Sequence, residues 1–194
     1  MEQKLKITIV EANSERARLI VDGLREAGDY DVTVLSDETS LARRLAALEP
    51  DVVLIDIANP SRDMLETLSV ASGANARPVA MFVDRSEEQM VTAAIKAGLS
   101  AYVVDGLRKE RVKPVMDAAI ARFHMVSQMR SELEQARAAL AERKTIDRAK
   151  GLLMRARGIS EEEAYGLLRK TAMDQGRKVV DVAQALVTAA DLLI

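Results

Sequence analysis

The sequence predicts an α/β protein in three parts: a doubly wound parallel sheet of five strands, a long helix, and a small module of three helices. Three observations support this prediction. Short apolar runs alternate with helix-period segments over the first hundred residues. Pro114 is the only helix-breaking residue in 108–150, and capping signals divide the remaining residues into short helices. Of the 194 residues, 48% are hydrophobic, which is enough for a buried core.

The elements of the first part follow one another as strand and helix. The expected strands are the apolar runs 6–10, 31–35, 51–55, 78–83 and 101–104. Gly28 is placed to end the first helix, Pro50 to end the second, and Ser86 with Gln89 forms a capping-box signal that opens a helix ending before Gly98. Nearly continuous apolar strands indicate a parallel sheet covered on both faces, with flavodoxin-like topology and a functional crevice beyond the strand carboxyl ends.

Polar residues stand at several of those strand ends. Asp56 follows the apolar run 52–55, and residues 94–104 read AIKAGLSAYVV. With these features, residues 1–122 resemble the receiver domain of two-component response regulators. In that family the aspartate after the third strand accepts a phosphoryl group from a histidine kinase, and nearby acids hold magnesium. The resemblance implies that Asp56 is the phosphoacceptor and that Glu11 and Asp56 are the ligands left for a weakened magnesium site.

The expected pocket departs from the receiver pattern at three positions. Ala12 replaces a second metal-binding acid, Val83 replaces a hydroxyl residue, and Asp105 replaces a lysine. Losing a carboxylate weakens a magnesium site, and Asp105 would repel the negative charge of a phosphoryl group. We therefore expect a degenerate receiver pocket that requires no cofactor, in which Asp56 is dispensable or only modestly important for output. The alternative is a regulator activated by phosphorylation of Asp56, with RNA or DNA output.

The long helix carries an apolar stripe at heptad spacing. Residues 123–141 are continuous with the last receiver helix and have no sheet to pack against, so a parallel coiled coil between two copies of the chain is expected. The homodimer seam would consist of Val126, Met129, Leu133, Ala136 and Leu140.

The C-terminal segment is locally basic, although the whole chain has a net charge of -2. Residues 143–178 contain ten Lys or Arg and five Asp or Glu, a balance that indicates a polyanionic partner such as nucleic acid. A helix should end at Gly158, a capping box at Ser160 should open the next, and a third should cover residues 178–193. Met173 is expected among the residues of the small core.

Three runs in this segment carry a second resemblance. IDRAKGLLM at 146–154, SEEEAY at 160–165 and LRKTAM at 168–173 resemble the ANTAR domain, expected here over residues 142–194. The resemblance, closest to regulators of the NasT and AmiR type, implies transcription antitermination by binding of stem-loops in nascent leader RNA. It also implies an inhibitory sensor protein as partner, for example a nitrate-responsive one. The expected RNA-binding residues are Arg148, Ala149, Lys150, Gly151, Arg155, Arg157, Arg169 and Lys170.

Other classes of function are disfavoured. The chain has no cysteine and a single histidine, His124, so a typical zinc site is not expected. It contains no Gly-rich phosphate loop or nucleophile–base motif, so we expect no enzyme. The apolar third helix of the module disfavours DNA reading. No run is long enough to span a membrane, and the protein is expected to be cytoplasmic.

Overall fold

The computed structural model describes residues 4–37, 40–105 and 107–192, which fold into two units, Met1–Ser127 and Gln128–Ile194. Helix α5 (Lys109–Arg157) contributes to both. Each unit has a hydrophobic core of its own.

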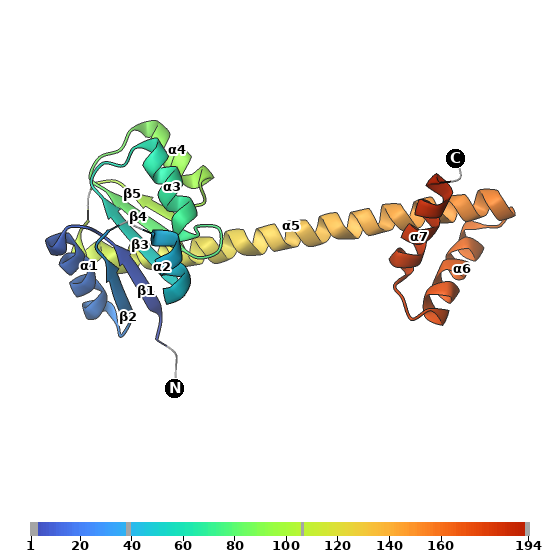
Figure 1. The fold of residues 1–194 in the computed structure, drawn as a ribbon, viewed down its shortest axis with the longest axis horizontal. Coiled ribbons are helices and arrows are strands. Elements are labelled where there is room, and N and C mark those ends of the chain that lie inside the picture. The colour runs from blue at the N-terminus through green and yellow to red at the C-terminus, as the bar shows by residue number, and fades with distance from the viewer. Residues whose placement is uncertain (1–3, 38–39, 106, 193–194) are drawn as a thin grey trace. The chain divides into compact units, whose positions relative to one another are not determined.

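The first unit is built on a parallel sheet with strand order β2-β1-β3-β4-β5, as Figure 1 shows. Its strands are β1 (Lys6–Val10), β2 (Asp31–Leu35), β3 (Val52–Ile57), β4 (Val79–Val83) and β5 (Ala101–Val103). The connecting helices are α1 (Ser14–Ala27), α2 (Leu41–Leu48), α3 (Arg62–Ser72) and α4 (Glu88–Lys96). The predicted doubly wound fold is confirmed.

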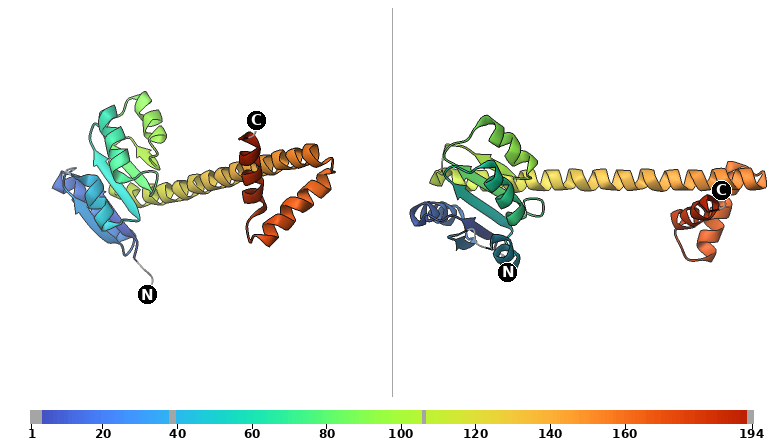
Figure 2. Two further views of the ribbon diagram at one scale, coloured as in Figure 1. Left: turned by 45° about the vertical axis from the view of Figure 1, so that its right-hand side comes forward. Right: turned by 45° about the horizontal axis from the view of Figure 1, so that its top comes forward.

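Helices cover both faces of this sheet (Figures 1 and 2). On one face α1 and the first turns of α5 pack over β1, β3 and β4, with Ile20 and Met116 buried between them. On the other, α2, α3 and α4 bury Leu45 and Leu65. At Gly23 the backbones of α1 and α5 come so close that an added Cβ would lie 2.8 Å from the carbonyl oxygen of Lys109.

The start of α4 differs from the prediction. Its N-cap is Glu87, and no side chain caps the helix. The hydroxyl of Ser86 instead hydrogen-bonds the carbonyl oxygen of Glu87 at 3.1 Å and lies 3.0 Å from the hydroxyl of Tyr102. The predicted capping box at Ser86 was therefore wrong, because a tertiary partner on β5 engages the hydroxyl.

Helix α5 runs for 49 residues and passes through Gly151 without a break. In the single chain, the large side chains of the stripe expected to form the coiled coil are exposed: Met129 is 58% exposed, Leu133 51% and Leu140 54%. Val126 is half-buried and Ala136 is exposed. The homodimer stays a prediction.

The second unit is completed by α6 (Glu161–Asp174) and α7 (Val179–Asp191). The predicted capping box at Ser160 is confirmed, since its hydroxyl accepts the Glu163 N–H at 3.2 Å and the Glu163 carboxylate accepts the Ser160 N–H at 2.8 Å. Met173 was wrongly expected in the core and is 72% exposed, because Ala172 takes the inward position of that turn. Buried side chains of this core are Ala149, Leu168, Ala183 and Val187.

Candidate functional site

An acidic cavity of about 420 Å³ lies at the carboxyl ends of β1 and β3. It is lined by three residues predicted for the receiver pocket, Glu11, Ala12 and Asp56. The Asp56 side chain is completely buried, and Glu11 is 7% exposed. Ionised carboxylates that are removed from water need a compensating charge.

Arg16, on the first turn of α1, supplies that charge. Its Nε and Nη2 donate to the two carboxylate oxygens of Asp56 at 2.8 and 2.6 Å. Its Nη1 and Nη2 donate to those of Asp84 at 2.8 and 3.0 Å. Hydrogen bonds to Asp56 and to Asp84 raise the pKa of Arg16, so the guanidinium stays charged. Sequence reasoning identified neither Arg16 nor Asp84.

Glu11 is the unusual acid of this cavity. Its pKa is raised from 4.5 to about 7, mainly by burial and also by the neighbouring Asp56, whereas the N–H of Asn13 and the charge of Arg16 oppose the rise. Its Oε1 accepts the Asn13 N–H at 2.6 Å. Its Oε2 lies 3.4 Å from Arg16 Nε and has no hydrogen-bond partner among the described residues. One guanidinium among three acids thus favours a protonated Glu11 near neutral pH.

The other expected pocket residues lie elsewhere. Val83 is fully buried in the core beneath α2, α3 and α4, and its neighbour Asp84 accepts a hydrogen bond from Arg16. Asp105 is exposed and has a left-handed backbone, with φ 77°. These positions correct the predicted roles of Val83 and Asp105 as lining residues of the pocket.

The receiver resemblance implies magnesium, and the residues present do not fit it. Ala12 offers no oxygen from its side chain, and both Asp56 oxygens accept hydrogen bonds from Arg16. Over residues 4–37, 40–105 and 107–192, no three His, Cys, Asp or Glu side chains are grouped to hold a metal ion. Magnesium needs several oxygen ligands in octahedral geometry, and this pocket presents a guanidinium at their centre.

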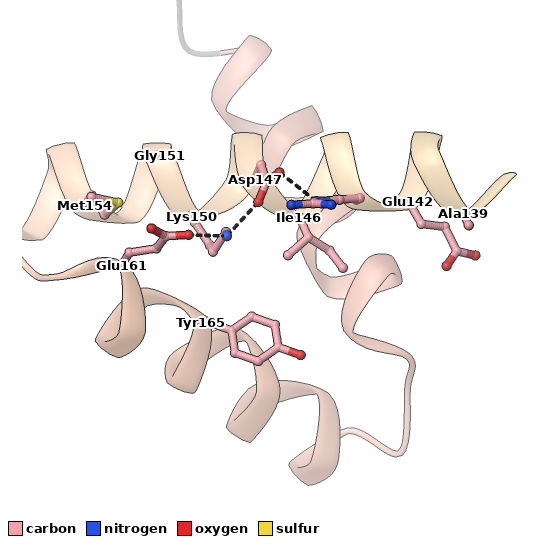
Figure 3. A pocket seen from close by; sticks show the side chains of 10 residues that line it. Ala139, Glu142, Ile146, Asp147, Lys150, Gly151, Met154, Glu161 and Tyr165 are labelled. Carbon is pink, nitrogen blue, oxygen red and sulfur yellow. Dashed lines mark hydrogen bonds and ion pairs between the residues drawn. The ribbon is translucent and has the colours of Figure 1, made fainter. Parts of the chain in front are cut away.

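A second cavity, of about 620 Å³, lies between α5 and α6 (Figure 3). Lys150 lies in its wall with its side chain 14% exposed. The ammonium is 2.6 Å from Asp147 Oδ1 and 2.6 Å from Glu161 Oε1, and these hydrogen bonds raise its pKa. Lys150 therefore links α5 to the first turn of α6. Gly151 follows it along the same wall.

The remaining expected RNA-binding residues divide into two groups. Arg148 pairs with Asp191 at 2.6 Å and so ties α5 to α7. Ala149 is completely buried, which corrects its prediction as an RNA contact, because no side-chain surface is left for RNA. The other four are exposed and form no ion pair with any described residue: Arg155, Arg157, Arg169 and Lys170.

Tyr165 was not singled out from the sequence as a site residue. It is 44% exposed and its ring faces the cavity beside Lys150 (Figure 3). Arg169 lies one helical turn further on α6, so both side chains lie on the same side of that helix. The spacing of four residues from Tyr165 to Arg169 was the signal in the sequence.

Comparison with known families decides the identity of the second unit. The ANTAR domain family matches residues 134–187. The chain contains an ANTAR domain. The sheet of the first unit and its helices give the chain a receiver-like fold ahead of its long helix.

Three regulatory proteins are similar to this chain over different lengths. The transcriptional regulatory protein PdtaR of Mycobacterium tuberculosis is 29% identical over 168 residues, which are 86% of this chain and 82% of PdtaR. The aliphatic amidase regulator of Pseudomonas aeruginosa is 26% identical over 137 residues, which are 70% of this chain and 69% of that protein. The nitrate regulatory protein of Klebsiella oxytoca is 43% identical over 65 residues, 34% of this chain and 16% of that protein.

Solved structures agree on the fold of the first unit. Chemotaxis protein CheY4 of Vibrio cholerae superposes with a TM-score of 0.51 at 15% identity, covering 60% of this chain and 99% of CheY4. The receiver domain of a diguanylate cyclase from Desulfovibrio desulfuricans gives 0.50 at 18% identity, over 63% and 98% of the two chains. Within the described residues, none of the helices combines the length and hydropathy of a membrane span.

Proposed function

We propose that this chain binds stem-loops in nascent leader RNA through its ANTAR domain and acts as a transcription antiterminator. The observation that carries the proposal is the group of four exposed cations that no described carboxylate neutralises: Arg155, Arg157, Arg169 and Lys170. Cations free of protein partners can contact phosphates at little cost, and arginine can also stack on or hydrogen-bond unpaired bases. Tyr165, one turn before Arg169 on α6, supplies an exposed aromatic face.

Lys150 has a different part in this proposal. Its ammonium is already held by Asp147 and Glu161, so a phosphate would have to compete with two carboxylates. We expect Lys150→Ala to weaken hairpin binding by about 1–3 kcal/mol. A salt dependence shallower by about one ion would assign Lys150 to a phosphate contact, and an unchanged one to positioning of α6 against α5.

The four cations can be tested together. Full-length protein is titrated with a hairpin RNA library of fixed stem and randomised loop, and with DNA of the same sequence. Replacing the four cations with alanine should cost about 2–4 kcal/mol and make the salt dependence shallower by up to about three ions. The matched control removes four exposed cations of the receiver-like domain: Arg18, Arg25, Arg43 and Lys96. Equal losses in both variants, or equal binding of RNA and DNA, would contradict the proposal.

Control of this activity is proposed to come from a protein partner. The charge and hydrogen bonding of the receiver-like pocket favour docking of a partner protein over phosphorylation of Asp56. The apolar stripe on α5 would pair two copies of the chain. In the proposal, a sensor protein blocks RNA binding until a small inducer releases it, and nitrate is the first inducer to test. Purification of the native protein from cells without inducer should yield the complex. Recovery of only a free, constitutively active dimer would rule out such a partner.

A further inference from the structure

The acidic cavity of the receiver-like domain contains a cation that belongs to the chain itself. Arg16 is the third residue of α1, whose N-cap Asn13 accepts the backbone N–H groups of Glu15 and Arg16. The N-terminal turn of a helix carries partial positive charge, so a cation is disfavoured there. Its presence at this position requires compensation by the carboxylates around it.

The contacts of Arg16 are specific for a guanidinium. Two forks are formed at once, one on Asp56 and one on Asp84, with all four distances between 2.6 and 3.0 Å. A planar guanidinium can make two bidentate pairs in this way, whereas the ammonium of a lysine acts as a point charge. The two acids come from different strand ends, β3 and β4, and Arg16 therefore joins them to α1.

The forks leave Asp56 without a free oxygen for phosphoryl transfer. Attack on a phosphoryl donor requires a carboxylate oxygen with access to the donor, and the Asp56 side chain is 0% exposed with both oxygens bonded to Arg16. A magnesium ion would have to approach these oxygens to about 2.0–2.1 Å. Arg16 Nε lies 3.4 Å from Glu11 Oε2 and 2.8 Å from Asp56 Oδ2, so the guanidinium lies against both acids that were expected to hold such an ion.

We propose that Arg16 is a permanent internal cation of this domain, taking the place of a bound metal and closing Asp56 to phosphoryl donors. The pocket then keeps the same arrangement of side chains at any concentration of divalent cation. This inference concerns the receiver-like domain alone and does not depend on RNA binding.

Removal of the guanidinium should let a divalent cation approach the carboxylates that Arg16 now neutralises. In full-length Arg16→Ala, Asp56 and Asp84 lose their hydrogen bonds to Arg16 and Glu11 loses a nearby positive charge, so the melting temperature should fall. About 10 mM Mg²⁺ should then raise it by roughly 5 °C or more, relative to a sodium chloride control of equal ionic strength. The wild type, and the Arg18→Ala variant of an exposed arginine on the same helix, should show no such rise.

Arg16→Lys provides a second readout if the alanine variant does not fold. It keeps the charge and loses the forks, so it should melt at a lower temperature than the wild type and remain insensitive to Mg²⁺. A wild-type protein stabilised by Mg²⁺, or a folded Arg16→Ala that ignores Mg²⁺, would overturn the proposal. So would a lysine variant with the melting temperature of the wild type.

Discussion

Replacing Gly151 with alanine separates the fold of the ANTAR domain from the RNA binding proposed for it. Gly151 lies within α5 and lines the cavity beside Lys150. An added Cβ would meet only the Nη1 of Arg155, at 3.7 Å, so the fold has room for it. Alanine is favoured over glycine within a helix by about 1 kcal/mol, and the variant should unfold at a slightly higher temperature. If an RNA loop approaches the backbone here, the methyl group should cost about 1–3 kcal/mol of binding.

The assay compares thermal unfolding with hairpin affinity in the same full-length preparations. The expected loss corresponds to a dissociation constant about 5- to 150-fold higher. Gly166 on α6 provides a matched control, because an added Cβ there has no neighbour within 4 Å and Gly166 does not line the cavity. Gly166→Ala should gain similar stability and keep its affinity. A more stable Gly151→Ala with unchanged affinity would refute a close RNA approach at this position.

Three further predictions concern the rest of the chain. The pKa of Glu11 is raised to about 7 in the folded protein, mainly by burial, and is about 4.5 in the unfolded chain. Between these two pH values the folded state keeps a proton that the unfolded state has lost. The free energy of unfolding should therefore fall by up to about 3 kcal/mol as pH rises from about 4.5 to about 7. In urea unfolding measured from about pH 5 to pH 8, Glu11→Gln should remove this fall. The same dependence of unfolding free energy on pH in the wild type and in Glu11→Gln would contradict the prediction. Leu133→Glu places a charge in the exposed stripe of α5 and should convert a dimer to a monomer by light scattering; an unchanged mass would place the interface elsewhere. Asp56→Asn should lower the melting temperature, because the fork between Arg16 and the buried Asp56 is weakened, yet keep hairpin affinity within about twofold; loss of RNA binding by the folded variant would restore a phosphorylation switch.

The sheet and the helices could be predicted because their apolar residues repeat with the period of each element. Ser160 was correctly identified as an N-cap, since both partners of that capping box lie within four residues. Ser86 has the same local pattern and fails, because Tyr102 on β5 engages its hydroxyl. Met173 fails for a related reason: the neighbouring alanine faces the core, which hydrophobicity alone does not reveal.

The candidate sites were predicted less completely than the fold. Asp56 and Glu11 could be located from the strands that precede them. Arg16 could not, because its partners are 40 and 68 residues away in sequence and only the folded sheet brings them together. Its one signal was a cation in the first turn of a helix, against the helix dipole. Lys150 could be singled out from the sequence as a cation of the motif, and its role in RNA binding stays a prediction, whereas its two carboxylate partners became visible only in the structure.

The central claim is that the ANTAR domain of this regulator selects leader RNA. Sequencing the RNA that co-purifies with the full-length protein, beside the variant lacking Arg155, Arg157, Arg169 and Lys170, tests it most directly. The account predicts enrichment of leader segments that contain paired stem-loops upstream of a terminator, and loss of that enrichment in the variant. Recovery of the same unselected RNA with both proteins would contradict the account.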